Sequence, residues 1–106
     1  MRSSSHAHLF AALGDPTRLR LVSRLCTGGP ASIARLTEGA GVTRQAVTKH
    51  LKVMKRSGLV RCMRRGRESV WQLDPRRLED ARHYLDLISG QWDAALARLR
   101  DFVENE

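Results

Sequence analysis

The sequence predicts a mainly α-helical domain with one small β-hairpin, and three observations lead to this fold class. Apolar residues recur at helical spacing through most of the chain. Two short segments rich in Val and Trp, 59–63 and 68–73, flank the basic string Arg64-Arg65-Gly66-Arg67. The last third repeats apolar residues every three or four positions, as a long helix does. A chain of 106 residues fits a single domain, here 1–106.

Two helices are expected at the N-terminal end. The first covers 8–13 and ends at Gly14. Asp15-Pro16 then begins a second helix, because Asp can cap it and Pro suits the first helical position. The Gly28-Gly29-Pro30 string ends this helix. Its apolar, buried face is expected to consist of Leu19, Val22, Leu25 and Cys26.

The next segment, about 32–57, predicts two helices joined by a tight turn. A short helix over 32–40 precedes Gly41, and Thr43 caps a second helix that runs over 44–57. Val42 and Val47 are spaced as a hydrophobic staple, which fixes the angle at which the chain enters that helix. The buried stripe of the second helix is Val47, Leu51 and Met54. This arrangement is a helix-turn-helix unit, and the basic hairpin of 59–73 that follows it is the wing of a winged helix-turn-helix.

The last helix is expected over about 75–103, with Asp74-Pro75 at its start. At 1.5 Å per residue, a helix of about 28 residues is about 42 Å long, which exceeds the width of so small a body. We therefore expect part of it to face a second subunit. Its apolar seam follows an a/d heptad pattern: Leu78, Ala81, Leu85, Ile88, Trp92, Ala95, Leu99 and Phe102.

Positive charge is concentrated on the predicted helix-turn-helix and wing. The net charge is +8, and residues 43–67 hold nine Lys and Arg and no Asp or Glu. The last 33 residues are mildly acidic by contrast, with five basic and eight acidic side chains. Basic side chains on a helix and hairpin suit a DNA groove, where they replace the counterions of phosphate. A solvated basic surface is the alternative explanation.

The N-terminal turns of the second helix of such a unit face the base edges of DNA. Arg44 can bind guanine in a bidentate manner, Gln45 can pair with adenine, and Thr48 can touch thymine. The lysines are expected on phosphate, and the wing arginines in the minor groove. For His50, a place near the core is the alternative. The predicted DNA-binding residues are Thr43, Arg44, Gln45, Thr48, Lys49, His50, Lys52, Arg64, Arg65 and Arg67.

Two strings carry a family resemblance: ALGDPTRLRL, with its Leu13–Arg20 core, and VTRQAVTKHLKVM followed by Gly58-Leu59-Val60. With them the chain resembles the ArsR/SmtB family of bacterial winged-helix repressors. The resemblance implies a homodimer built from the first and last helices, an inverted-repeat operator (the protein's own operon among the candidates) and a signal that relieves repression. The residues expected at the dimer interface are Leu9, Leu85, Ile88, Trp92, Leu99 and Phe102.

The sequence departs from the metal-sensing members of that family, so we expect no metal and no other cofactor. The stretch that matches their thiolate motif, 30–34, has no Cys, and the last helix carries only His83. Zinc needs about four ligands. A pair formed by His6 and His8 on the N-terminal arm, with carboxylates from a partner, remains an alternative. Cys26 on a buried face and Cys62 in the wing are not expected to meet as a redox pair.

Other function classes find little support in the sequence. No catalytic set or phosphate-binding loop is evident, so we expect no enzyme. The sequence has neither an apolar run of about 18 residues nor a signal peptide, so we expect a cytoplasmic protein with no membrane span. A metal- or thiol-responsive repressor and a non-specific architectural nucleic-acid-binding protein remain the alternatives. A small-molecule inducer between the last helices, near Tyr84 and Trp92, stays open.

Overall fold

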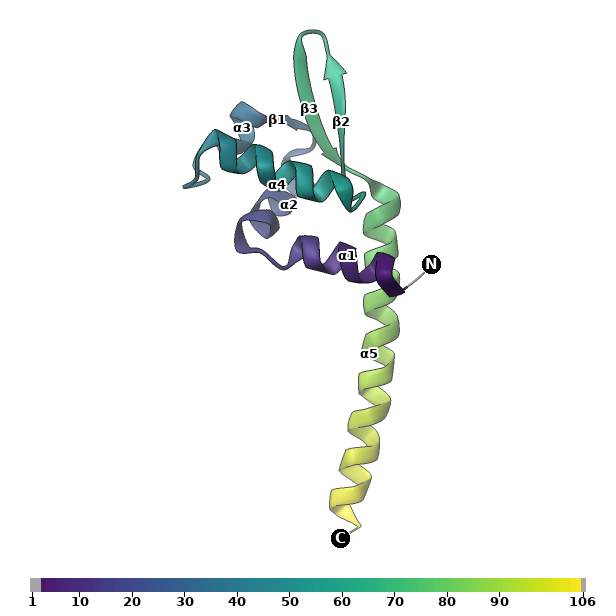
Figure 1. Ribbon diagram of the computed structural model, residues 1–106. Coiled ribbons are helices and arrows are strands. Elements are labelled where there is room, and N and C mark those ends of the chain that lie inside the picture. Colours follow the sequence, from purple (N-terminus) through teal and green to yellow (C-terminus); the bar gives the residue numbers. More distant parts are fainter. Residues whose placement is uncertain (1–2, 106) are drawn as a thin grey trace.

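A computed structural model describes residues 3–105 and confirms the mainly helical class with a small antiparallel sheet (Figure 1). The described chain reads in order α1 (Ser3–Leu13), α2 (Pro16–Gly28), β1 (Ala31–Ser32), α3 (Ile33–Thr37), α4 (Arg44–Arg56), β2 (Val60–Arg65), β3 (Glu68–Leu73) and α5 (Pro75–Glu104). Helices α3 and α4 form the helix-turn-helix, and β2 and β3 form the wing.

Side-chain caps begin three of the helices at the predicted residues. The Asp15 carboxylate accepts a hydrogen bond of 3.0 Å from the Arg18 N–H at the start of α2. Thr43 Oγ1 accepts one of 3.1 Å from the Ala46 N–H in α4. The Asp74 carboxylate does the same for α5 over 3.0 Å. Each cap satisfies an N–H that the helix itself cannot pair, so these helices begin where the sequence expects them.

The sheet has three strands in the order β1-β3-β2, one more than predicted. Strand β1 is two residues long, and Ala31 pairs with Trp71. The wing turn is also tighter than expected, because pairing continues to Arg65↔Glu68 and leaves only two residues between the strands. Gly66 has a φ of 62° there while Arg67 has a negative φ, as a type II′ hairpin turn requires. Arg64 and Arg65 therefore belong to β2 and not to the tip.

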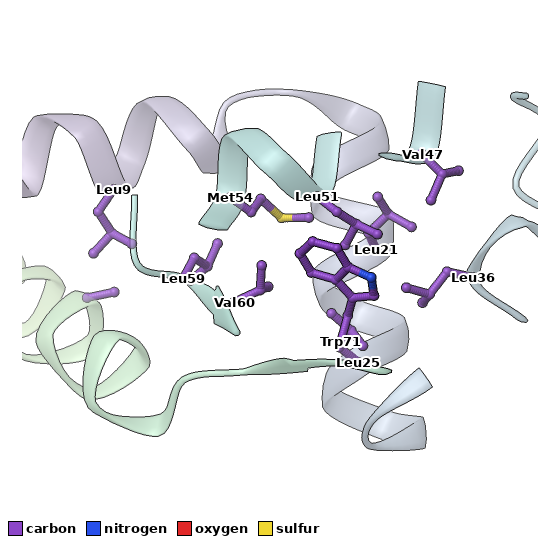
Figure 2. Packing of buried hydrophobic residues seen from close by; sticks show 11 residues of the cluster. Leu9, Leu21, Leu25, Leu36, Val47, Leu51, Met54, Leu59, Val60 and Trp71 are labelled. Atoms are coloured by element: carbon purple, nitrogen blue, oxygen red, sulfur yellow. The ribbon is translucent and has the colours of Figure 1, made fainter. Parts of the chain in front are cut away.

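The core lies between α2, α4 and the sheet, where Trp71 of β3 packs among leucines of both helices (Figure 2). The predicted stripe of α4 is fully buried in it. The indole Nε1 of Trp71 has no hydrogen-bond partner among the described residues. The buried cluster consists of Leu9, Leu21, Leu25, Leu36, Val47, Leu51, Met54, Leu59, Val60, Trp71 and Ala81.

Two predictions about α1 and α2 are wrong. Leu21 and Leu25 form the buried face of α2, because that face meets α4 and β3. Leu19 is 52% exposed as a result, and Cys26 is exposed rather than buried. Leu9, which was expected at the dimer interface, has no exposed surface in a single chain. Its side chain belongs to the core and cannot contact a partner subunit.

Helix α5 is packed against the body only at its N-terminal end. Leu78 and Ala81 join the core, and the Tyr84 ring lies 4.2 Å from His6 and 5.6 Å from Phe10 of α1 between ring centroids. Beyond this point the helix runs clear of the body (Figure 1), and the molecule extends over 66 × 30 × 22 Å. In the part of the chain that the structure describes, no helix combines the length and the apolar character needed to span a membrane.

Candidate nucleic-acid interface

One face of α4 presents the predicted reading residues to solvent. Arg44, Gln45, Thr48, Lys49 and Lys52 line one shallow hollow on the surface. They lie opposite the buried stripe of Val47, Leu51 and Met54, so the same helix that anchors the core exposes its polar face. We call these five residues the reading row. Within residues 3–105, the side chains of Arg44, Gln45, Lys49 and Lys52 form no hydrogen bond or ion pair and are free to bind a ligand.

The two threonines of this region already use part of their hydrogen-bonding capacity. Thr43 Oγ1 accepts the capping bond, so its hydroxyl hydrogen remains available. Thr48 Oγ1 donates to the Arg44 carbonyl over 2.9 Å. That leaves Thr48 an acceptor and a methyl group, which suit an amino group or a thymine methyl on a base edge.

His50 lies at the junction of α2 and α4, apart from the reading row. Its Nδ1 is 3.3 Å from Arg18 Nη1 and 3.9 Å from the Asp15 carboxylate. Arg18 also donates to the Ala11 and Ala12 carbonyls at the end of α1. The Arg18 N–H bond, with the charges of His50 and Arg18 adding to it, lowers the pKa of Asp15 below its ordinary 3.8. This polar cluster ties three helices together behind the reading row.

The wing carries Arg64, Arg65 and Arg67, all exposed. Arg67 lies next to the reading helix, because it lines a hollow together with Arg44, Ser32 and Ser69. Glu68 lies in the same hollow and is paired across the sheet with Arg65. Arg44 and Arg67 thus approach one another from α4 and from the wing, while Arg64 and Arg65 lie along β2.

Two arginines that the sequence analysis did not single out hold the helix-turn-helix in place. Arg24 Nη1 donates to the carbonyls of Leu36 and Glu38, each over 2.7 Å, and its Nη2 donates to Arg35 over 2.8 Å. Arg77 Nε donates to the Ser57 carbonyl over 2.9 Å. Carbonyls at a helix end lack partners within the helix, so these side chains satisfy the ends of α3 and α4. No sequence motif marks an arginine for such a role.

The residues considered for metal or thiol chemistry do not converge. His6 and His8 lie within helix α1 and not on a loose arm, and residues two apart on a helix point to different sides. His6 packs on Tyr84, whereas His8 is exposed. Cys26 and Cys62 are both free thiols. Across the described residues, no group of three or more His, Cys, Asp or Glu side chains is placed to hold a metal ion.

Comparisons with known proteins agree with this architecture. Residues 13–62 match the family described as "Helix-turn-helix domain". The HTH-type transcriptional regulator Rv2034 of Mycobacterium tuberculosis is 38% identical over 97 residues, covering 92% of this chain and 87% of that protein. The structure of an ArsR-like transcriptional regulator from Rhodococcus sp. RHA1 superposes with a TM-score of 0.77 at 31% identity, covering 93% and 92% of the two chains.

A more distant structure shows the same fold. The homodimeric winged helix-turn-helix DNA-binding domain Mb0332 of Mycobacterium bovis has a TM-score of 0.66 at 22% identity, covering 88% of this chain and 82% of that one. The likeness to Rv2034 and to the Rhodococcus regulator extends over nearly the whole of each chain. This chain therefore belongs to the ArsR family of winged helix-turn-helix proteins and is a DNA-binding transcriptional regulator.

Proposed function

We propose that the protein is a repressor that binds an inverted-repeat operator as a homodimer. The observation that carries this proposal is the reading row on α4, which continues through Arg67 into the wing. Four of its five side chains are exposed and unpaired among the described residues: Arg44, Gln45, Lys49 and Lys52. No Asp or Glu interrupts the positive charge between residues 43 and 67. A helix with such a face fits the major groove, and a basic hairpin beside it can reach the neighbouring minor groove.

Sequence reading is assigned to the first turns of α4. Arg44 and Gln45 are exposed side chains with free donors, and they suit guanine and adenine edges respectively. Thr43 and Thr48 add hydroxyl or methyl contacts, whereas Lys49 and Lys52 bind phosphate and fix the register of the helix. Arg64, Arg65 and Arg67 neutralise the backbone or enter the minor groove. We place His50 behind these contacts, where it supports α4 or reaches a phosphate.

The homodimer is proposed from the distal half of α5. Leu85, Trp92, Leu99 and Phe102 are exposed on a helix that leaves the body, and together with Ile88 they form one seam. The Mycobacterium bovis domain of the same fold is described as homodimeric. A two-fold pair of reading helices predicts half-sites about one helical turn of DNA apart, roughly 34 Å.

Footprinting of the DNA upstream of the protein's own gene, with and without zinc, tests the proposal. We expect a protected inverted repeat that overlaps the promoter and does not change with zinc. Affinity should fall steeply with salt, since several phosphates are neutralised in each subunit. Equal affinity for this fragment and for random duplexes would instead indicate a non-specific architectural protein, and release by zinc would indicate a metal-responsive repressor.

The variant Arg44→Ala tests the reading assignment directly. It should weaken operator binding by about 1–3 kcal/mol and relax the base preference at one position of each half-site. Arg76→Ala is the matched control, because Arg76 is an exposed arginine in the first turn of α5, away from the reading row. Equal losses in the two variants would show that only total charge matters.

A further inference from the structure

A hollow between α1 and α4 lies apart from the reading row and the wing. It is lined by His8, Ala11, Ala12, Arg18, Val53, Arg56 and Ser57, and its volume is about 440 Å³. Sites for small molecules commonly enclose ~300–1,000 Å³, with apolar walls and a few convergent polar groups. None of the residues assigned to DNA reading lines this hollow.

The lining combines positive charge with an apolar floor. His8, Arg18 and Arg56 bring basic groups from three different helices, and no acidic side chain is present in the lining. Ala11, Ala12 and Val53 supply the apolar part. Ser57 adds little for an anion, because its hydroxyl already donates to the Met54 carbonyl over 2.8 Å. Charge of one sign beside methyl groups is complementary to an anion that carries a short hydrocarbon body.

The two arginines of the hollow keep donors free for such an anion. Arg56 forms no hydrogen bond or ion pair with the described residues. Arg18 contacts the Ala11 and Ala12 carbonyls and His50, which occupy three of the five N–H groups of a guanidinium. A carboxylate between the two side chains would gain charge-assisted hydrogen bonds, which are about twice as strong as neutral ones.

We propose that this hollow binds a small organic carboxylate, and that the bound carboxylate weakens DNA binding. The second step rests on the proposed repressor function. Arg18 links the end of α1 to His50 on α4. A carboxylate bound by the free donors of Arg18 and by Arg56 would draw the Arg18 guanidinium toward the hollow and weaken its contact with His50, which holds the reading helix. On this proposal the inducer is a small organic carboxylate, and it binds within one subunit, away from the seam of α5.

Direct titration calorimetry without DNA tests the binding step with three probes. Benzoate carries both the charge and the apolar body, benzamide is its neutral counterpart, and inorganic phosphate has charge but no apolar part. We expect one saturable benzoate site per chain and affinities for the other two probes that are at least about tenfold lower. Absence of a saturable benzoate site would overturn the proposal, and so would tighter binding of phosphate.

Variants of neighbouring residues on α4 separate a built site from diffuse charge. Arg56→Gln removes a cation that lines the hollow, and Lys55→Gln removes an exposed cation that does not. We expect benzoate affinity to fall about tenfold in the first variant and to be unchanged in the second. Ala11→Leu fills the hollow while keeping every charge, and it should also abolish binding. An equal effect of the two glutamine variants would overturn the proposal.

Operator release tests the regulatory step separately. Benzoate should displace the wild-type protein from the protected fragment, while Arg56→Gln should resist displacement relative to Lys55→Gln. If benzoate binds saturably but DNA affinity does not change, the hollow is a carboxylate site but not an inducer site. Benzoate binding by a protein that shows no operator preference would instead count against the proposed repressor function and leave the site intact.

Discussion

The body of the protein buries its apolar side chains, whereas the distal half of α5 leaves them exposed. In the body, leucines from α1 to α4 and Trp71 of β3 are buried within a single chain. In the distal half, Trp92 and Phe102 are each 68% exposed, and four leucines (Leu85, Leu87, Leu96 and Leu99) and Val103 are exposed as well. Both regions are rich in apolar residues at regular spacing, so the sequence pattern alone does not distinguish them.

The difference shows that an apolar stripe on a helix is buried only where another surface packs against it. Leu78 and Ala81, the first residues of the heptad pattern, pack against the body. Later residues of the same pattern, Leu85, Trp92, Leu99 and Phe102, are exposed to solvent. Burial of apolar surface is worth about 25 cal/mol per Å², so an exposed stripe of this length favours association. The body thus folds on its own core, whereas the exposed seam of the distal half is the surface that the proposed dimer would bury.

The largest expected effect is the loss of the proposed dimer when a residue of the α5 seam is replaced by a charged one. Leu99→Glu places a charge where two subunits would meet, and it should weaken dimerisation on the order of 100-fold or more, since both subunits are changed. Leu87→Glu is the control, because Leu87 is similarly exposed on α5 but lies off the seam. Sedimentation measures both. If the Leu87→Glu variant is monomeric, or the Leu99→Glu variant remains dimeric, the seam of α5 is not the surface through which the subunits associate.

A cavity in the body should reduce stability rather than association. Leu51→Ala removes a fully buried side chain from α4 and should lower the free energy of unfolding by about 2–5 kcal/mol. Leu87→Ala, which truncates an exposed leucine, should change it by less than about 0.5 kcal/mol. Urea unfolding of each variant provides the comparison. Similar losses in the two variants would mean that the tail is packed as tightly as the body.

Within the body, Arg24 tests how far the helix-turn-helix depends on one side chain. Arg24→Gln leaves the carbonyls of Leu36 and Glu38 at the end of α3 without their donor, while the Arg35 carbonyl keeps the Glu38 N–H, and it should cost about 1–3 kcal/mol of stability. Operator affinity should fall as well, because α3 supports α4. Arg20→Gln on the same helix breaks only a 3.4 Å bond to Thr17 and should leave both quantities nearly unchanged. If Arg24→Gln changes stability and operator affinity as little as Arg20→Gln does, the hydrogen bonds of Arg24 do not hold the helix-turn-helix in place.

The smallest effect concerns the cap of α2. The pKa of Asp15 is lowered in the folded state by the Arg18 N–H and by nearby positive charge. Its stabilising effect is therefore fully present above pH 3.8 and is lost as the pH falls through the lower native value. Asp15→Asn keeps a capping oxygen without the charge. It should be slightly less stable than wild type at pH 7 and equal to it in acid, as urea unfolding at several pH values measures. A constant difference across pH would contradict this origin.

Local signals in the sequence predict most of the fold. Asp15, Thr43 and Asp74 act through neighbours two or three residues away, so their caps are readable directly. The spacing of Val47, Leu51 and Met54 likewise fixes which face of α4 is polar. That face is the greater part of the candidate site, so its residues can be predicted from the sequence alone.

What the sequence does not predict depends on contacts between distant segments. The pairing of Ala31 with Trp71 creates a strand too short to leave a pattern. The burial of Leu21 instead of Leu19 depends on how α2 is rotated against α4. Arg24 meets carbonyls 11 to 14 residues away, and His50 meets Arg18 from 32 residues away. The sequence predicts Leu9 at the dimer interface because the first helix is expected there, but the Leu9 side chain is buried in the core of its own chain.

Helix α5 starts at Pro75, and only its capping residue Asp74 separates it from Leu73 at the end of the wing strand. It therefore acts as a rigid lever joined directly to the DNA-binding head. Over roughly 40 Å of helix, a change of about 5° in the crossing angle of two such levers shifts a head by on the order of 3 Å, close to one base-pair step. Small adjustments at the far end of the molecule would thereby retune the spacing between half-sites that a dimer accepts.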